Sequence, residues 1–402
     1  MNILYILRHN PWGIGGGCYA CRCYLDAFME VFKGAHLDVC ICEEYLNGHG
    51  NEDGLQFTVD GLHGDDNVNY IGVKPRGIMA KALSPFTGLL HRFDGTARRM
   101  LKSKKYDYCI FDHNSIAGPL VGLCKKLGVR TIVINHNCEA EYYRDNYVGF
   151  LHQHVFLPHA RSAERKSYSG CDFNIFLTME DHVLFEKFYG ESQTKPIVLG
   201  CFEPKSKQDR GITNIQRNER ENEYPLKMVI SGTIGNVQNL DGINYFLDEL
   251  LPHVSNEVIV VIAGKNPPSE LFRRIESINE QRNGTIQLIP NPSDMMSIVS
   301  DCDIFVCPTR LGGGIKLRVM DGLKAGLPVI AHTVSARGYS DFIEKGMMWS
   351  FDNADGFAKA QQSVFKRIKD GRLSKTDIQE FAVQQFSFEK KVELIKKYIN
   401  VS

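Results

Sequence analysis

A short segment around residue 313 carries the residue types that bind phosphate groups. Three consecutive glycines, Gly312, Gly313 and Gly314, are followed by the basic side chain of Lys316. Glycine lets the backbone approach an anion closely, and the free amides at the start of a helix point toward it. Lys316 would add a full positive charge. The pattern therefore predicts a loop that binds a phosphate or diphosphate group.

The sequence on either side of these glycines predicts the elements that hold the loop. Ile304–Cys307 is a short apolar run, as expected for a buried parallel strand. Apolar residues recur at helical spacing over residues 315–323, and Gly326 and Pro328 would end that helix before another strand begins at Val329. This order places a phosphate at the helix start, although an ordinary turn of an α/β domain has the same outline.

Two neighbouring strands earlier in the chain are each predicted to end in polar residues. The run 108–111 is followed by Asp112 and His113, and the run 131–134 leads to His136, Asn137 and Glu139. Open α/β sheets bind ligands at the carboxyl ends of their strands. One histidine is more often structural than catalytic, but two at neighbouring strand ends indicate a functional site.

A second glycine loop follows the first predicted strand. Residues 2–7 are apolar, and the loop 9–17 contains Gly15, Gly16 and Gly17 before a predicted helix over residues 18–32. The position of this loop directly after the first strand favours a place in a ligand site. A lone glycine loop also serves as a tight turn, so the pattern leaves both interpretations open.

Two groups of residues have the types that bind metals. Cys18, Cys21 and Cys23 cluster within one predicted helix, but no second cluster completes the four ligands of a usual zinc site, and a metal or redox role is the less favoured interpretation. The 12 cysteines otherwise scatter along the chain like small buried apolar residues. Asp301 and Asp303 precede an apolar strand, whereas a metal-binding pair of this kind should follow one. We therefore expect no metal.

Composition limits the classes of partner. The 402 residues include 47 basic and 47 acidic side chains, so the net charge is zero, which argues against a general nucleic-acid binder. No apolar run approaches the ~20 residues of a spanning helix, and the first residues resemble a strand more than a signal peptide. We expect a soluble, cytoplasmic protein. The basic, amphipathic stretch 74–105 would either lie on an anionic membrane surface or pack as a helix on its own sheet.

Strands alternate with helices throughout the chain, which predicts an α/β protein with two doubly wound parallel-sheet domains. A hydrophobic content of 43% is sufficient for two cores. We place the first domain at residues 1–202, a polar linker at 203–225 and the second domain at 226–385. Residues 386–402 are predicted to form a C-terminal helix.

The segment 301–339 closely resembles the donor-binding signature of the family 4 (group 1) retaining glycosyltransferases, in its triple-glycine form. The family motif has two glutamates separated by seven residues; Gly313 stands at the first position, and Asp321, one methylene shorter, stands at the second. The polar residues after the runs 108–111 and 131–134 resemble the family as well. The resemblance implies the GT-B fold, in which two Rossmann-like domains face each other across a cleft and the C-terminal helix crosses back to the first domain.

The resemblance also implies roles for individual residues. His113, Lys316 and Asp321 would act at the reaction centre, with Asp321 on the donor ribose. The turn at residues 233–240 lacks the arginine and lysine pair that family members often carry, so Lys316, with Arg310, would supply that charge. The donor would contact Gly232, Thr233, Arg310, Gly312, Gly313, Gly314, Ile315, Lys316, Leu317 and Asp321, and the acceptor side of the cleft would include Gly15, Gly16, Gly17, His136, Asn137 and Glu139.

The implied reaction moves a sugar from a nucleotide-diphosphate sugar to a hydroxyl of a glycan or lipid-linked acceptor, with retention and without a metal or other cofactor. Family members usually build cell-envelope or capsular polysaccharide, which suggests a cytoplasmic enzyme, peripheral on the inner face of the membrane through residues 74–105. The alternatives are a catalytically inactive GT-B partner subunit and a GT-B epimerase or phosphorylase. The sugar, the base and the oligomeric state stay open.

Overall fold

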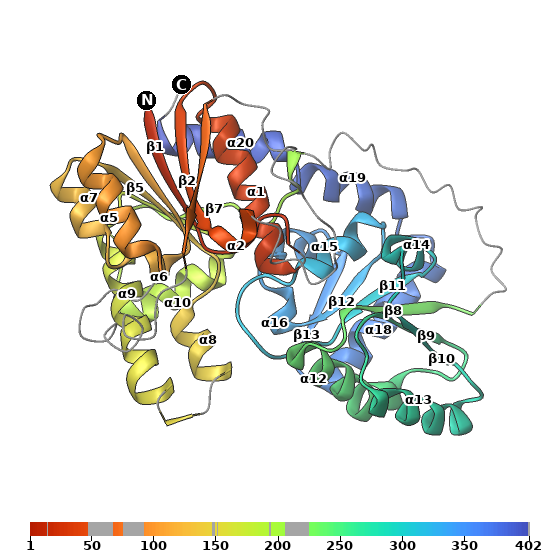
Figure 1. Ribbon diagram of the computed structural model, residues 1–402. Helices are drawn as coiled ribbons and strands as arrows, with labels where there is room; N and C mark the ends of the chain where they lie inside the picture. Colours follow the sequence, from red (N-terminus) through yellow and green to blue (C-terminus); the bar gives the residue numbers. More distant parts are fainter. Residues whose placement is uncertain are drawn as a thin grey trace. The chain divides into compact units, whose positions relative to one another are not determined.

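The computed structural model describes residues 1–13, 15–46, 67–74, 92–146, 149–150, 152–192, 194–205 and 225–400 (Figure 1). The chain divides into two compact units, one of Met1–Gly211 with Ser387–Ser402 and the other of Ile212–Phe386. The division lies within the predicted linker 203–225, most of which falls outside the described residues.

Within the described residues, the first unit is built on a seven-stranded sheet of order β3-β2-β1-β4-β5-β6-β7. All neighbouring strands pair in parallel. The central strands are apolar runs whose side chains are almost all buried, as a sheet covered on both faces requires. The strands span Asn2–Leu7 (β1), His36–Cys42 (β2), Val68–Val73 (β3), Tyr108–Asp112 (β4), Arg130–Asn135 (β5), Phe173–Phe176 (β6) and Ile197–Val198 (β7).

Helices connect these strands, and the C-terminal helix α20 (Phe388–Ile399) belongs to the same unit. It packs beside α1 (Gly16–Val31), as Figure 1 shows. Phe388 of α20 lies against Phe202, which follows β7. The other described helices are α2 (Glu43–Leu46), α5 (Phe93–Ser103), α6 (Asn114–Ala117), α7 (Val121–Lys126), α8 (Glu139–Asn146), the π-helix His152–Phe156, α9 (Leu157–Gly170) and α10 (Met179–Tyr189).

Residues 75–91 of the basic stretch 74–105 lie outside the described residues, and the rest of the stretch includes α5. Within α5, Phe93, Ala97 and Leu101 are buried in the core of the first unit. The apolar face of α5 is therefore covered by its own sheet, as one of the two interpretations expects. The membrane interpretation stays a prediction for the rest of the stretch.

Within the described residues, the second unit is built on a six-stranded parallel sheet of order β10-β9-β8-β11-β12-β13. Its core is apolar and includes Met228, Val260, Ile304 and Ile330. The strands span Lys227–Thr233 (β8), Ile259–Lys265 (β9), Ile286–Pro290 (β10), Ile304–Cys307 (β11), Val329–His332 (β12) and Met348–Phe351 (β13).

The helices of the second unit follow its strands in alternation. The predicted helix at 315–323 begins later, at Leu317, because Lys316 is an extended cap residue. The described helices are α12 (Val237–Tyr245), the π-helix Phe246–Leu250, the 3-10 helix Leu251–His253, α13 (Ser269–Arg282), α14 (Met295–Ser300), α15 (Leu317–Lys324), α16 (Thr333–Ala336), α17 (Ser340–Glu344), α18 (Ala354–Lys369) and α19 (Lys375–Gln385).

Both sheets reverse their strand order beside the first strand of the unit. In the first unit β1 lies between β2 and β4, and in the second unit β8 lies between β9 and β11. Connections leave such a switch point in opposite directions, which opens a crevice at the carboxyl ends of the strands. The predicted α/β fold with two doubly wound parallel sheets is confirmed. Among the described helices, none is both long and apolar enough to cross a membrane.

Candidate functional site

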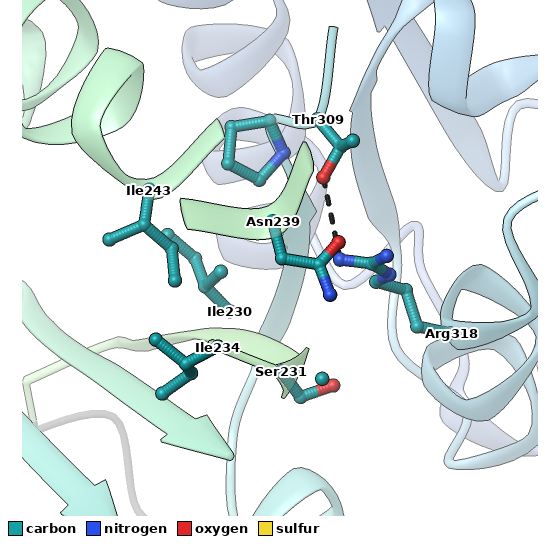
Figure 2. Close-up of a pocket in the computed structure, with 9 residues that line it drawn as sticks. Ile230, Ser231, Ile234, Asn239, Ile243, Thr309 and Arg318 are labelled. Carbon is teal, nitrogen blue, oxygen red and sulfur yellow. Dashed lines mark hydrogen bonds between the residues drawn. The ribbon is translucent and has the colours of Figure 1, made fainter. Parts of the chain in front are cut away.

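A pocket lies at the switch point of the second unit, between the ends of β8 and β11 (Figure 2). Gly232 near the end of β8 has a φ of 142°, which favours glycine, and a Cβ atom there would lie 3.3 Å from the guanidinium of Arg318. A glycine is therefore needed for both its conformation and its small size. The pocket is lined by Ile230, Ser231, Gly232, Ile234, Asn239, Ile243, Pro308, Thr309 and Arg318.

Arg318 is a pocket residue that the sequence analysis did not identify. It stands on α15, and its Nη1 atom donates to the Thr309 hydroxyl at 3.4 Å. Figure 2 shows its guanidinium beside Thr309 and Asn239. Asn239, which is buried, donates in turn to the Thr233 carbonyl at 2.7 Å. Arg318 thus brings a positive charge to the turn after β8, where the sequence itself has no basic residue.

The lysine that follows the triple-glycine loop donates hydrogen bonds back to the backbone of that loop. Lys316 is 7% exposed, and its ammonium group donates to the carbonyls of Gly312 and Gly313 at 3.3 and 3.1 Å. Gly312 has a φ of 83°, and a Cβ atom there would lie 2.4 Å from Gln238. The Tyr339 hydroxyl donates to the Lys316 carbonyl at 3.0 Å. The lysine thus holds its own loop in shape, in addition to carrying charge.

The other predicted donor residues of the second unit do not line the pocket. The Arg310 guanidinium pairs with Asp241 at 3.0 Å and lies over the ring of Tyr245. Thr233 is exposed at the end of β8, and Asp321 is partly buried on α15. Of the predicted donor contacts, the pocket includes Gly232, whereas the set Gly313, Gly314, Ile315 and Leu317 lies on the loop and at the start of α15.

Asp301 and Asp303 lie at the amino end of β11, away from the carboxyl ends that form the pocket. The Lys227 ammonium pairs with Asp301 at 2.6 Å, and the Lys227 amide donates to Asp303 at 2.9 Å. These contacts tie β11 to β8, so the two aspartates have a structural role.

In the first unit, the predicted residues of β4 and β5 do meet. The His113 and His136 rings stack with their centroids 5.8 Å apart, and His113 Nε2 lies 2.9 Å from the Glu139 carboxylate. His113 has a backbone φ of 153°, a conformation that residues other than glycine rarely adopt. Such strain is concentrated at functional sites.

Arg8, at the end of β1, is a second residue that the sequence analysis missed. Its guanidinium lies 3.0 Å from the ring nitrogens of His113 and 3.8 Å from Glu139. Burial lowers the pKa of His113, and the charge of Arg8 lowers it further, whereas Glu139 opposes the shift. His113 is therefore neutral at pH 7, with one ring nitrogen able to donate and the other able to accept.

His136 is held by Asp112, the last residue of β4. The His136 Nε2 atom lies 2.5 Å from Asp112 Oδ1, and Asp112 is fully buried. Burial raises the pKa of the Asp112 carboxyl, but the charge and hydrogen bond of His136 outweigh that effect and hold the pKa below its ordinary value. The sequence placed Asp112 at a strand end without assigning its partner.

Glu164 on α9 fixes the turn that carries Asn137 and Glu139. Its carboxylate accepts from the amides of Glu139 and Ala140 at 2.5 and 3.0 Å, and from the Tyr189 hydroxyl at 2.6 Å. The Asn114 side chain donates both to Glu164, at 2.8 Å, and to the Asn137 carbonyl, at 3.2 Å. The turns after β4 and β5 are therefore joined through one buried carboxylate. No sequence pattern marked Glu164.

The first glycine loop lies against this histidine cluster. Gly15 has a φ of 128°, α1 begins at Gly16, and a Cβ atom on Gly17 would lie 3.5 Å from the ring of His9. His9 meets His113 edge to face with centroids 6.1 Å apart. Burial, together with His113 and Arg8, lowers the pKa of His9 to about 3. The loop and the strand-end residues of the first unit thus form one polar site.

Comparison with known proteins finds a family match for the second unit. Residues 228–367 match the family described as "Glycosyl transferases group 1". An uncharacterised 44.6 kDa protein from the cps region of Klebsiella pneumoniae is 24% identical over 334 residues, which cover 78% of this chain and 82% of that protein.

Several solved structures share the fold along the whole chain. HepE of Anabaena in complex with UDP has a TM-score of 0.61 at 13% identity, covering 100% of both chains. WaaG, a glycosyltransferase involved in lipopolysaccharide biosynthesis, has a TM-score of 0.59 at 15% identity and covers 98% of this chain and 99% of its own. Sucrose-phosphate synthase from Thermosynechococcus elongatus has a TM-score of 0.65 at 14% identity, covering 99% and 98%. The chain therefore has the GT-B fold, and its second unit carries a group 1 glycosyltransferase domain.

Proposed function

We propose that this protein is a retaining glycosyltransferase that moves a sugar from a nucleotide-diphosphate sugar to a hydroxyl of a glycan or lipid-linked acceptor. The observation that carries the proposal is the switch-point pocket of the second unit, where Arg318 faces the Gly232 backbone inside the region that matches the glycosyltransferase family. HepE in complex with UDP has the same fold, which supports a nucleotide donor. The relative from a cps region supports a role in capsular or cell-envelope polysaccharide synthesis.

The donor would bind to the second unit through its diphosphate. Arg318 and the amides at the end of β8 would face one phosphate, and the amides at the start of α15 would face the other. Lys316 keeps the loop in shape and adds to the positive potential. When the glycosidic bond breaks, negative charge builds on the diphosphate, and these fixed donors would stabilise it without help from a divalent ion. Asp321 is proposed to hold the ribose.

The acceptor would bind to the first unit. Neutral His113 and the Glu139 carboxylate are both buried and hydrogen-bonded, so their positions are fixed before substrate binds. His113, His136, Asn137 and the loop Gly15 to Gly17 would orient the acceptor hydroxyl. No side chain is assigned as a nucleophile, since we propose attack on the donor face that the diphosphate leaves. Fixed, preorganised polar groups of this kind lower a barrier more than mobile ones.

The exposed basic residues of α5, Arg99, Lys102 and the nearby Lys105, are available to an anionic surface. We propose that they bring the enzyme to the inner face of the cytoplasmic membrane, where a lipid-linked acceptor would lie. Flotation with anionic and neutral liposomes tests this. Binding that requires anionic lipid supports the proposal, and equal recovery with both kinds of liposome contradicts it.

The transferase proposal is tested by incubating the protein with single nucleotide sugars, with and without a lipid and glycan extract as acceptor source. Release of nucleoside diphosphate that depends on acceptor supports a transferase. Isomerised nucleotide sugar without acceptor would indicate an epimerase. Nucleotide binding without turnover under any condition would indicate an inactive partner subunit, which the substitution of Gly313 for the family glutamate makes a specific alternative.

A further inference from the structure

In the first unit, three side chains of metal-binding types meet from distant parts of the sequence, and one of them is the stacked histidine His136. Cys21 belongs to α1, Asp112 ends β4, and His136 follows β5. The Cys21 sulfur, a carboxylate oxygen of Asp112 and a ring nitrogen of His136 all lie within 4.8 Å of one another. Cys21 and Asp112 are fully buried, and the His136 side chain is 10% exposed.

We propose that Cys21, Asp112 and His136 bind one Zn²⁺ ion. A thiolate, an imidazole and a carboxylate are the ligands that zinc accepts at about 2.0 to 2.3 Å, whereas Ca²⁺ and Mg²⁺ prefer oxygen ligands only. The charges also balance, because one thiolate and one carboxylate neutralise a divalent cation. A buried site that is neutral overall avoids the cost of an unpaired charge in the protein interior.

Among the described residues, the hydrogen bonding around Asp112 leaves its Oδ2 atom with only a weak donor. His136 Nε2 lies 2.5 Å from Asp112 Oδ1, so a proton is held between the two atoms. Asp112 Oδ2 is buried and has no hydrogen-bond partner among the described residues apart from the weak thiol donor of Cys21 beside the carboxylate. A buried carboxylate oxygen without a strong partner is costly. A cation that replaced the thiol proton and the shared proton would satisfy the sulfur, nitrogen and oxygen atoms together.

The neighbouring cysteines of α1 differ in their relation to this cluster. Cys23 donates its thiol hydrogen to the Phe202 carbonyl at 3.1 Å, so it takes no part. Cys18 stands one turn before Cys21, on the same face of the helix, and the two have the Cys-x-x-Cys spacing of many zinc sites. The fourth ligand would be Cys18 or a water molecule.

The ion would have a structural role. It would join the first turns of α1, which begins within the glycines Gly15 to Gly17, to the ends of β4 and β5. These are the elements that position His113 and Glu139. The proposal departs from the sequence-based expectation of no metal, which rested on the spacing of Cys18, Cys21 and Cys23 and on the position of Asp301 and Asp303 before a strand. It leaves the proposed transfer chemistry without a catalytic metal, so either proposal can fail without the other.

The test uses full-length, tag-free, reduced protein treated with a chelator and then titrated with Co²⁺ and Zn²⁺. We expect one metal per chain, a thiolate-to-cobalt charge-transfer band that Zn²⁺ abolishes, and a higher melting temperature with Zn²⁺. Cys21→Ser and Asp112→Asn should weaken Co²⁺ binding by about 100-fold or more, since each removes a direct ligand. Cys23→Ser is the matched control, because a hydroxyl can still donate to Phe202, and it should bind like the wild type.

The proposal is overturned if the wild-type protein binds no metal, or if Cys21→Ser and Cys23→Ser bind Co²⁺ equally well. X-ray absorption of the zinc-loaded wild type gives a result that does not depend on any variant folding. One or two sulfur atoms at about 2.3 Å from the zinc support the site. A first shell of nitrogen and oxygen alone contradicts it.

Discussion

The two units share one architecture but fill its switch point with different chemistry. At the ends of β1, β4 and β5, the first unit places buried and partly buried titratable groups close together: His9, His113, His136, Asp112 and Glu139. At β8 and β11, the second unit places glycine backbone beside the fixed charges of Arg318 and Lys316. The first site is suited to orienting a neutral hydroxyl and the second to binding an anion. Acidification should therefore act on the first unit much more than on the second.

The largest expected effect separates the two arginines of the second unit. Arg318→Ala should lower the rate of transfer by about a hundredfold to a thousandfold, as the loss of one preorganised charge donor usually does. Arg310→Ala is the matched control, because Arg310 pairs with Asp241 outside the pocket lining. It should stay within about threefold of the wild type. Steady-state kinetics of the two variants decide the matter, and equal losses would show that the pocket is not the donor site.

The next effect should be confined to the first unit. Glu164→Gln replaces one acceptor oxygen by an NH2 group, which would face the N–H and O–H groups that donate to that oxygen. Two donors cannot pair, so we expect a loss of about 2 to 3 kcal/mol in the free energy of unfolding. Glu393→Gln, exposed on α20, serves as the control and should change little. Urea unfolding with nucleotide binding as a second readout checks this. If Glu164→Gln loses nucleotide binding at urea concentrations too low to unfold it, the site of the first unit and the nucleotide site of the second unit are not independent.

Acid should destabilise the first unit through His9. The folded state keeps His9 neutral down to a pKa of about 3, whereas the unfolded state protonates it near the ordinary value of 6.5. The stabilising contribution is therefore fully present above pH 6.5 and is lost as the pH falls toward 3; at pH 5 the loss is about 2 kcal/mol. His9→Gln should remove this part of the pH dependence between pH 7 and 5.

Unfolding curves at several pH values provide the measurement for His9. His253→Gln alters an exposed histidine of the second unit and should leave the wild-type dependence intact. An unchanged slope in His9→Gln would mean that the cluster of the first unit does not resist protonation.

The smallest of these effects is expected for Lys316. Its ammonium group already donates to two loop carbonyls, so only part of its charge is available to a ligand. Lys316→Met should therefore lower transfer about tenfold, less than Arg318→Ala. Lys316→Arg should recover most of the activity if charge matters more than loop shape. A loss in Lys316→Met as large as that in Arg318→Ala would make the two cations equivalent.

The sequence predicted the fold well because its signals are local. Ile304–Cys307, the glycines after it and the stop at Gly326 and Pro328 lie within one segment, and the strand, loop and helix appear there as expected. The strand-end residues His113, His136 and Glu139 were also found, since the carboxyl ends of neighbouring parallel strands must meet.

The residues that the sequence missed depend on contacts between distant segments. The helical spacing of its segment did not mark Arg318 as a site residue, although its guanidinium lies beside Gly232 at the end of the neighbouring strand β8. Arg8, which follows β1, and Glu164 on α9 contact the histidine site. No spacing of residues in the sequence predicts these contacts. Arg310 is close to the glycine loop in sequence, but its side chain pairs with Asp241 on α12 and does not line the pocket. Competition between partners of this kind is decided in three dimensions.

The most direct test of the account is thermal unfolding of the wild type and of Arg318→Ala with UDP, GDP, ADP and CDP. A ligand at about 100 times its dissociation constant stabilises the protein that binds it by about 2.7 kcal/mol, which is readily seen. We predict that one of the four nucleotides stabilises the wild type and that the same nucleotide stabilises Arg318→Ala little or not at all. No stabilisation by any nucleotide, or equal stabilisation of both proteins, would contradict a donor site at the β8–β11 switch point.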